Sequence, residues 1–256
     1  MPIHLRQICL VAESLQPAVD DLIAVLGIEP CHVDPEVGKW GLENTLLPIG
    51  SNFLEVVAPL EDDTSAGRHL ARRHGDGGYM VICQATTKAE QDATRSRAQE
   101  SQTRIAYESD RDTWRLMQLH PGDMQGAYLE VDWDEQADPI GNWMPAGGIA
   151  WQSHTKSNVT QRITGAELQG PDPLAMAQHW GRVCGVQPVL SNGTPIVPLA
   201  NASLRFVSDK DGRGPGLGGI DIQTSNPTAL LQNAQDRSCL ISDQQVMICG
   251  TRINIA

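Results

Sequence analysis

The chain has 256 residues, and 31 acidic against 19 basic side chains give it a formal net charge of -12. This excess of negative charge argues against nucleic acid as a partner, because the phosphates would repel it. No apolar run approaches the roughly 18 residues that span a bilayer, and no charged segment followed by an apolar run opens the chain. The sequence therefore predicts neither a membrane partner nor a signal peptide.

The use of cysteine bears on the cellular compartment. The cysteines are scattered without Cys-x-x-Cys pairs, at Cys9, Cys31, Cys83, Cys184, Cys239 and Cys249. Their spacing shows no disulfide framework, and several stand in apolar runs, where small buried thiols are common. We therefore expect a reduced, cytoplasmic protein.

The beginning of the chain follows the order strand, helix, strand, strand. Residues 3–12 favour a strand, and residues 16–26 carry apolar side chains at helical spacing before Gly27 ends the helix. Two further strands, 41–49 and 51–58, are joined by turn residues and predict a hairpin. A polar connection then leads to the next strand.

The same order starts again at Tyr79. A strand, a helix and three more strands are predicted in turn for residues 79–85, 88–99, 103–109, 114–119 and 127–132. This pattern indicates an internal repeat of one supersecondary unit. Residues 133–158 are rich in Asp, Gly, Pro, Asn and Ser and predict a linker, with a short strand at 149–152.

Two further units complete the chain. In the third, a helix over 173–184 begins at the capping residue Asp172 and stops at Gly185, between strands at 163–168 and 203–207. The fourth unit contributes a strand, a short helix and two more strands at 219–224, 227–235, 238–241 and 246–255. Four such units, two in each half, indicate an α+β protein.

Two of the predicted strands carry a carboxylate at their centre. Glu55, in strand 51–58, shares a face with Phe53. An ionised carboxylate on an interior face needs a cation, a metal or hydrogen bonds to compensate it. The pattern recurs in Tyr-Leu-Glu-Val at Glu130. Either two carboxylates are aimed at one place, or both are edge-strand glutamates exposed to water.

These motifs carry a resemblance to a known family. The matching segments are Gln-Ile-Cys-Leu-Val-Ala-Glu-Ser from Gln7, Phe-Leu-Glu-Val at Glu55, Gly-Gly-Tyr-Met-Val-Ile-Cys-Gln at Tyr79 and Tyr-Leu-Glu-Val at Glu130. The chain resembles the vicinal oxygen chelate superfamily, which has the glyoxalase and bleomycin-resistance fold, most specifically over residues 5–133. The resemblance implies paired βαβββ units that form half-barrels around a metal site, with these four residues at the ligand positions.

The resemblance also divides the chain. It implies an N-terminal glyoxalase-like module over 1–135, a linker over 136–158 and a degenerate C-terminal module over 159–256. In the last module the ligand positions fall on residues that would bind no metal, which are Gly165, Phe206, Gly219 and Asn254. Two tandem modules of two units each account for the whole chain.

The chemistry that the resemblance implies depends on a divalent metal. Glyoxalase I enzymes of this kind use Gln, Glu, His and Glu, and here Tyr79 stands where His is usual. Two carboxylates and an amide are suitable ligands for Zn, Ni, Mn, Fe or Mg, so this ligand set does not identify the metal. One carboxylate, Glu55 or Glu130, would leave the metal to take a proton.

Two functions are compatible with that resemblance. The first is a metal-dependent enzyme that acts on a small oxygen-bearing molecule, as a lyase, an isomerase or a dioxygenase. The alternative is a metal-free protein that binds or sequesters a small molecule, as resistance proteins of this fold do. The protein would be a monomer or a homodimer, because the internal duplication already supplies the pairing of units.

Further residues are candidates for the site. Tyr79 could be a catalytic acid or a substrate hydrogen-bond donor, or its ring could pack in the core. His120, in the turn before the Glu130 strand, could supply the missing imidazole or be a turn residue. The pocket candidates, on or near strands that would line a half-barrel, are Asn44, Trp114, Arg115 and Met124.

Overall fold

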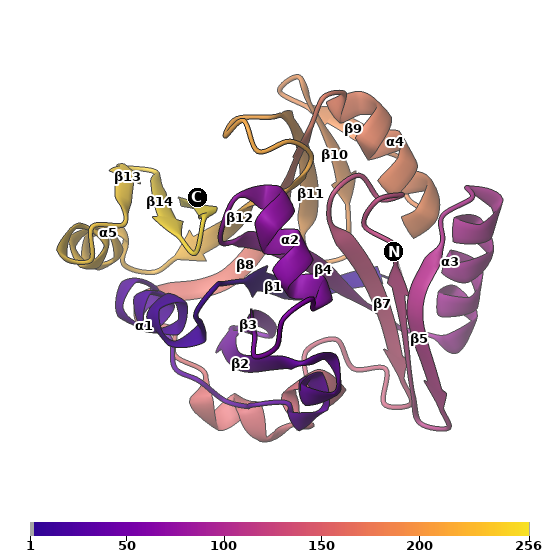
Figure 1. Ribbon diagram of the computed structural model, residues 1–256, viewed down its shortest axis with the longest axis horizontal. Coiled ribbons are helices and arrows are strands. Elements are labelled where there is room, and N and C mark those ends of the chain that lie inside the picture. Colours follow the sequence, from indigo (N-terminus) through magenta and orange to yellow (C-terminus); the bar gives the residue numbers. More distant parts are fainter. Residues whose placement is uncertain (1–2, 256) are drawn as a thin grey trace. The chain divides into compact units, whose positions relative to one another are not determined.

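The structure is a computed structural model that describes residues 3–255 (Figure 1). The α-helices are α1 (Leu15–Leu26), α2 (Ser65–Arg73), α3 (Lys88–Glu100), α4 (Pro173–Cys184) and α5 (Pro227–Asp236), and the 3-10 helices are η1 (Pro35–Trp40), η2 (Met144–Ala146) and η3 (Ala150–His154). The strands are β1 (Ile3–Val11), β2 (Leu42–Ile49), β3 (Asn52–Pro59), β4 (Gly77–Ala85), β5 (Ile105–Arg111), β6 (Trp114–Leu119), β7 (Tyr128–Asp134), β8 (Thr160–Gly170), β9 (Val189–Ser191), β10 (Thr194–Pro198), β11 (Ser203–Ser208), β12 (Gly216–Thr224), β13 (Leu240–Ser242), β14 (Gln245–Ile248) and β15 (Thr251–Ile255).

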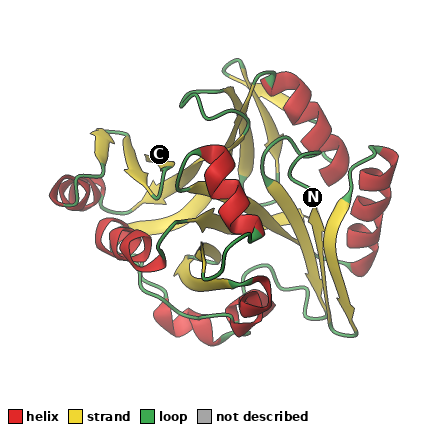
Figure 2. Cartoon of the chain, viewed as in Figure 1, coloured by secondary structure: helices red, strands yellow, loops and turns green. Residues whose placement is uncertain are grey.

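Each half of the chain supplies one open β-sheet. The first half forms a seven-stranded sheet in the order β2-β3-β1-β4-β7-β6-β5, and the second half an eight-stranded sheet in the order β13-β14-β15-β12-β8-β11-β10-β9. Helices stand between runs of consecutive strands along the chain (Figure 2). This arrangement confirms the predicted α+β class and the two tandem modules. Within residues 3–255, no helix is both long and apolar enough to cross a membrane.

The chain clusters into two compact units, each built from separated stretches of sequence. Unit 1 contains the chain up to Gln7, Met80–Ile140 and Gly165–Gly218. Unit 2 contains Ile8–Tyr79, Gly141–Thr164 and the chain from Gly219. Each unit therefore combines elements from both halves of the sequence.

In unit 1, α3 lies alongside β5, β6 and β7 (Figure 1). Gln91 Nε2 on the helix donates to the carbonyl oxygen of Val131 at 2.8 Å, and Lys88 Nζ lies 5.7 Å from the ring centre of Trp133. Side chains alternate between the faces of a strand. Trp133 therefore faces the helix, and Glu130 faces away from it.

The second helix of unit 1, α4, confirms the helix predicted between Asp172 and Gly185. The Asp172 side chain accepts a hydrogen bond from Ala175 N, and Gly185 ends the helix in the left-handed conformation with φ 68°. The ring of Trp180 meets that of Phe206 on β11 edge to face, with 6.1 Å between ring centres. Phe206 therefore faces α4, and its neighbours along β11 face the opposite side.

In unit 2, β2 and β3 form the predicted hairpin, in which Leu46 pairs with Glu55. Gly50 makes the turn with φ 62°, a backbone conformation that glycine adopts without strain. Phe53, on the same face as Glu55, meets the ring of Trp151 edge to face at 5.1 Å. The hairpin face that carries Phe53 and Glu55 is therefore covered at Phe53 by a residue from the segment between the two modules.

That intervening segment is ordered around Trp151. The indole is buried, and its Nε1 donates to the carbonyl oxygen of Gly141 at 3.1 Å. The short strand predicted at 149–152 is wrong, because these residues enter the 3-10 helix η3. The burial of the indole against Phe53 sets the local conformation, and no local sequence pattern reports such a contact.

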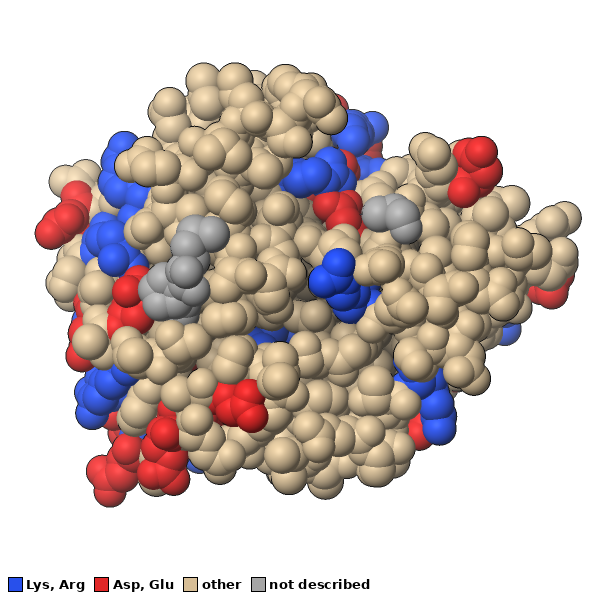
Figure 3. Space-filling view, turned by 180° about the vertical axis from the view of Figure 1, so that it is seen from behind, with Lys and Arg blue, Asp and Glu red and all other residues tan. Residues whose placement is uncertain are grey.

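Charged side chains of both signs share the surface. On the face drawn in Figure 3, basic and acidic residues lie close to one another. Ion pairs hold several of them, such as Arg104 with Asp123 and Arg115 with Asp110. The net negative charge is therefore spread over many small clusters of mixed sign.

Candidate functional site

The buried carboxylate on β3 is held by a neighbouring amide. Glu55 is 7% exposed, and Asn44 Nδ2 on β2 donates to its Oε1 at 2.7 Å. Asn44 Oδ1 accepts from Asp34 N at 3.0 Å, which fixes the orientation of the amide. Because hydrogen bonds to charged groups are the stronger ones, Asn44 offsets part of the free energy needed to bury Glu55.

The carboxylate on β7 has a corresponding partner. Glu130 is 5% exposed, and Gln118, directly opposite it on β6, donates from Nε2 to its Oε2 at 2.6 Å. In both repeats, therefore, the glutamate of the Leu-Glu-Val motif receives a hydrogen bond from a carboxamide on the adjacent antiparallel strand. The edge-strand alternative is wrong, because both glutamates are buried.

Two more carboxylates share the face of β7 that carries Glu130. Asp132 and Asp134 follow at alternate positions and are buried. Trp114 Nε1 donates to Asp132 Oδ2 at 3.2 Å, and Gln84 Nε2 on β4 donates to Asp134 Oδ2 at 3.1 Å. The other oxygen of Asp134 accepts from two backbone amides of the following turn. Unit 1 thus has a continuous polar face on β7.

The electrostatics of this face are dominated by burial. Burial raises the pKa of Asp132 well above its usual range, and the nearby Glu130 raises the pKa further. Arg6 is also fully buried. Desolvation lowers the pKa of Arg6 to about 10, although Asp134 and Asp138 oppose the shift. The guanidinium therefore stays charged at neutral pH, beside several acidic groups.

Comparison with known proteins assigns the family. The glyoxalase-like domain family matches residues 8–184. The chain belongs to this family. It therefore lies within the vicinal oxygen chelate superfamily, as the sequence motifs predicted. A search of curated proteins found no match to this chain.

Solved structures confirm the fold. A hypothetical protein from Staphylococcus aureus is similar with a TM-score of 0.65 and 13% identity, over 100% of this chain and 99% of that one. A mutant 4-hydroxymandelate synthase from Streptomyces coelicolor is similar with a TM-score of 0.68 and 14% identity, over 93% of this chain and 76% of that one. A methylmalonyl-CoA epimerase from the same organism has a TM-score of 0.45 and 21% identity, over 53% of this chain and 99% of that one.

In this glyoxalase-like protein, Tyr79 is engaged with α2. Its hydroxyl donates to Ser65 Oγ at 3.2 Å, and its ring meets that of His69 edge to face at 4.9 Å. On β4, Ile82 is the register partner of Glu130. Tyr79 stands an odd number of residues from Ile82 along the same strand, so its side chain leaves the opposite face.

The first ligand position, Gln7, is buried on β1. Its neighbour Arg6 has the side chain that approaches the end of β7, where Nη1 donates to the carbonyl oxygen of Asp138 at 3.4 Å. Successive residues of a strand point to opposite faces, so Gln7 points away from the side on which Arg6 approaches Asp134.

The two glutamates lie in different units. Glu55 belongs to unit 2 and Glu130 to unit 1, and their convergence stays a prediction.

The remaining candidates divide into two groups. Asn44 and Trp114 lie beside the buried carboxylates described above. His120 Nδ1 accepts from Gly122 N at 3.1 Å and from Arg104 at 3.2 Å, as a residue that stabilises its own turn. Arg115 forms ion pairs with aspartates, one of them on α3, and the Met124 carbonyl accepts from Trp180. These contacts of the second group lie within unit 1, and a role in the site stays a prediction.

Five residues at the β7 face were not predicted from the sequence: Arg6, Gln84, Gln118, Asp132 and Asp134. One signal was present, since Glu-Val-Asp-Trp-Asp places three acids at alternate positions of a predicted strand. The roles of Arg6 and Gln84 depend on which strands pair and in which register. A local pattern does not report that information.

Within either unit taken by itself, the described residues do not supply the ligand set of a glyoxalase I metal ion. Across residues 3–255, no group of three or more His, Cys, Asp and Glu side chains is arranged to hold a metal ion. At the fourth ligand position the phenol of Tyr79 is bonded to Ser65. On β7, both oxygens of Asp134 accept hydrogen bonds. A tetrahedral or octahedral site needs more convergent donors than this.

The C-terminal module also carries a buried charge. Glu167 on β8 is almost fully buried and forms ion pairs with Arg205 at 3.1 Å and Lys210 at 3.0 Å. Arg205 is its register partner on β11 and alternates with Phe206, so this pair lies on the face away from α4. The sequence predicted a degenerate module whose ligand positions bind no metal, and Glu167 was not among the predicted residues.

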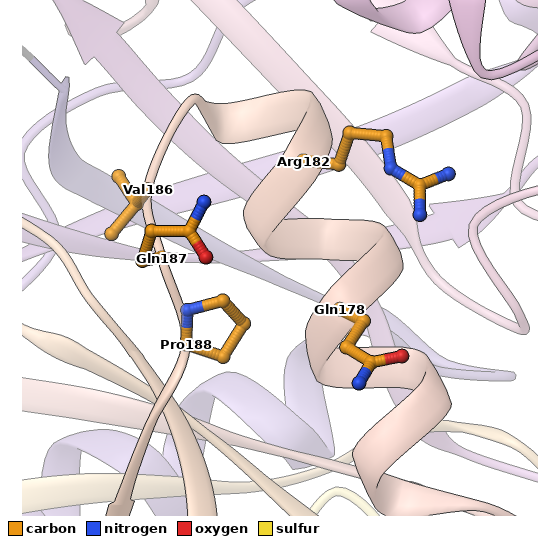
Figure 4. Close-up of a pocket in the computed structure, with 5 residues that line it drawn as sticks. All are labelled: Gln178, Arg182, Val186, Gln187 and Pro188. Carbon is orange, nitrogen blue, oxygen red and sulfur yellow. The ribbon is translucent and has the colours of Figure 1, made fainter.

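A surface pocket of about 320 Å³ lies at the end of α4 (Figure 4). It is lined by Gln178, Arg182, Val186, Gln187 and Pro188. Figure 4 shows Gln178 and Arg182 projecting from the helix and the other residues following it. None of the residues predicted for the site lines this pocket.

Proposed function

We propose that this glyoxalase-like protein binds a small organic molecule at the β7 face of unit 1, without a resident metal ion. One observation carries the proposal: Glu130, Asp132 and Asp134 share one buried face, where amide and indole groups hold their side chains. Ligand sites combine a few fixed polar groups with apolar surroundings. The fold supports this reading, because 4-hydroxymandelate synthase, a structural relative, is named for a small organic product.

The proposal is tested by ligand screening with chelator-treated full-length protein. Small ketones, hydroxy acids, catechols and amines are compared by the shift in melting temperature that each produces. We expect a ligand that stabilises the protein to lose that effect in Glu130→Gln. The control Glu100→Gln changes an exposed glutamate at the end of α3 and should bind as wild type.

The same assay tests the absence of a resident metal. Mn²⁺, Ni²⁺ and Zn²⁺ should give no stabilisation that depends on Glu130, because the surrounding residues supply too few convergent ligands. A saturable divalent-ion effect that Glu130→Gln removes would contradict the proposal.

A second candidate is an enzyme that moves a proton, of the isomerase or lyase type. The two buried carboxyl groups of Glu130 and Asp132, at alternate positions of β7, favour it, because neighbouring carboxyl groups in unlike surroundings can act as an acid and a base. The measurement is deuterium incorporation from D₂O beside the carbonyl of a bound ketone or hydroxy acid, followed by NMR. Glu130→Gln should stop the exchange, and exchange equal to that of wild type would remove this candidate.

The expected compartment and assembly belong to the same proposal. All six cysteines are free thiols, as suits a reduced cytoplasmic protein. We expect a monomer or a homodimer. Light scattering after size-exclusion chromatography tests the assembly, and a larger particle would contradict it.

A further inference from the structure

Two buried acceptor atoms on the β7 face receive no hydrogen bond. They are Asp132 Oδ1 and Gln84 Oε1, and both residues are 0% exposed. The two residues are register partners on the parallel strands β7 and β4, so their side chains stand next to each other on one face. Buried polar atoms are nearly always paired, and two neighbouring exceptions need an explanation.

Neither side chain can turn to correct this without losing a hydrogen bond. Asp132 Oδ2 accepts from Trp114 Nε1 at 3.2 Å, and Gln84 Nε2 donates to Asp134 Oδ2 at 3.1 Å. Turning the Gln84 amide over would place its oxygen against the Asp134 carboxylate. The two acceptors are therefore a fixed feature of the folded chain.

The charge around the two acceptors is negative. Glu130 and Asp134 lie on the same face as the two acceptors, and Arg6 is a cation that acts on this face through Asp134. The group that these acceptors lack should therefore bring at least two hydrogen-bond donors and a positive charge. Gln118 and Trp114, on β6, are half-buried and place the edge of this face at solvent.

We propose that Asp132 and Gln84 bind the ammonium group of a primary amine. An ammonium offers three N–H donors, so it can satisfy both acceptors at once and offset the excess negative charge. The inference rests on the proposed function and names the chemical class of its ligand. A bound water also supplies two donors, but it brings no charge.

The test compares four probes of similar size on chelator-treated full-length protein at constant pH and ionic strength. Propylammonium should bind saturably in calorimetry. The other three probes should not bind. Tetramethylammonium has no N–H donor, propanol has no charge, and propionate has a negative charge. Equal binding of tetramethylammonium would overturn the proposal, because that ion cannot donate a hydrogen bond.

Two substitutions locate the site. Asp132→Asn keeps an acceptor for Trp114 but replaces the second carboxyl oxygen by an amide N–H donor, and Gln84→Met keeps the length but removes the acceptor together with the donor to Asp134. Each should weaken propylammonium binding by about tenfold or more, the range of a hydrogen bond to a charged group. Gln99→Met, at an exposed position of α3, should bind as wild type. Wild-type affinity in both Asp132→Asn and Gln84→Met overturns the proposal.

The outcomes separate this inference from the proposed function. If neutral or acidic molecules stabilise the protein in a manner that depends on Glu130 and no amine binds, the ammonium site is wrong and the proposed function stands. If no class of molecule binds, both fail. A crystal soaked with propylammonium that shows only water between Asp132 and Gln84 would also reject the ammonium site.

Discussion

The β3 face of unit 2 and the β7 face of unit 1 carry the same motif in different surroundings. Glu55 has one amide partner, Asn44, and shares its face with Phe53, which Trp151 covers. Glu130 has an equivalent amide partner and two further acids on its face. The repeat thus preserves a glutamate with a carboxamide donor, while the rest of each face has diverged. One face is closed by aromatic packing, and the other is polar.

Removing the aromatic cover of the β3 face should have the largest effect. Trp151→Ala leaves a cavity against Phe53, so we expect unfolding free energy to fall by about 3–5 kcal/mol. Trp114→Ala on the β7 face, at a half-buried position, should cost about 1–2 kcal/mol. Urea denaturation measures both. Equal losses would mean that the two faces are closed to the same degree.

Removing the amide partner of each glutamate should have the next largest effect, and the loss of unfolding free energy should differ between the two faces. Asn44→Leu takes a donor from Glu55, and we expect a loss of about 2–3 kcal/mol in unfolding free energy. Gln118→Leu should cost about 1 kcal/mol, because Gln118 is half-buried and water can replace its donor. Combining Asn44→Leu with Glu55→Gln should recover part of the loss. The comparison fails if Gln118→Leu is the more harmful change.

A pH dependence should mark the β7 face. The pKa of Asp132 is raised in the folded protein, so between the unfolded pKa and the folded one the native state binds more protons. The contribution of Asp132 to the free energy of unfolding is therefore fully present at pH below the unfolded pKa near 4. That contribution falls as the pH rises, by up to about 1.4 kcal/mol per pH unit. Asp132→Asn should flatten this slope in urea denaturation from pH 4 to 7. Parallel profiles for the two proteins would contradict the assignment.

The smallest effect is expected at Tyr79. Tyr79→Phe removes one hydrogen bond to Ser65 and should cost about 0.5–1.5 kcal/mol of unfolding free energy. Ligand binding at the β7 face should not change, because the phenol leaves β4 on the opposite face. A large loss of binding with unchanged stability would restore Tyr79 as a site residue.

The sequence predicted the features that depend on local chemistry. The capped helix from Asp172 to Gly185 and the hairpin turning at Gly50 were found because caps and turns use particular residues. The β9–β10 hairpin was missed, although Asn192 and Gly193 make its turn with positive φ. That Asn-Gly pair is itself a hairpin signal.

The candidate site was predicted in part. Glu55 and Glu130 were named from the repeated strand motif, and Asn44 and Trp114 as pocket candidates on strands expected to line a half-barrel. All four lie in the hydrogen-bonded groups described above. The pairing of Gln84 with Asp132 depends on the register of two strands that are distant in sequence. A shift of one residue would send every side chain to the other face, so only the folded structure could supply it.

The interleaving of the two units has a consequence for synthesis. The chain leaves the ribosome N-terminus first, but unit 1 extends to Gly218 and unit 2 includes the last strands. Helix α3 therefore remains without its partner α4 until that helix has emerged and Arg97 on α3 can donate to the carbonyl oxygen of Val183 on α4. A gene divided between the two modules would encode fragments that complete unit 1 only by finding each other.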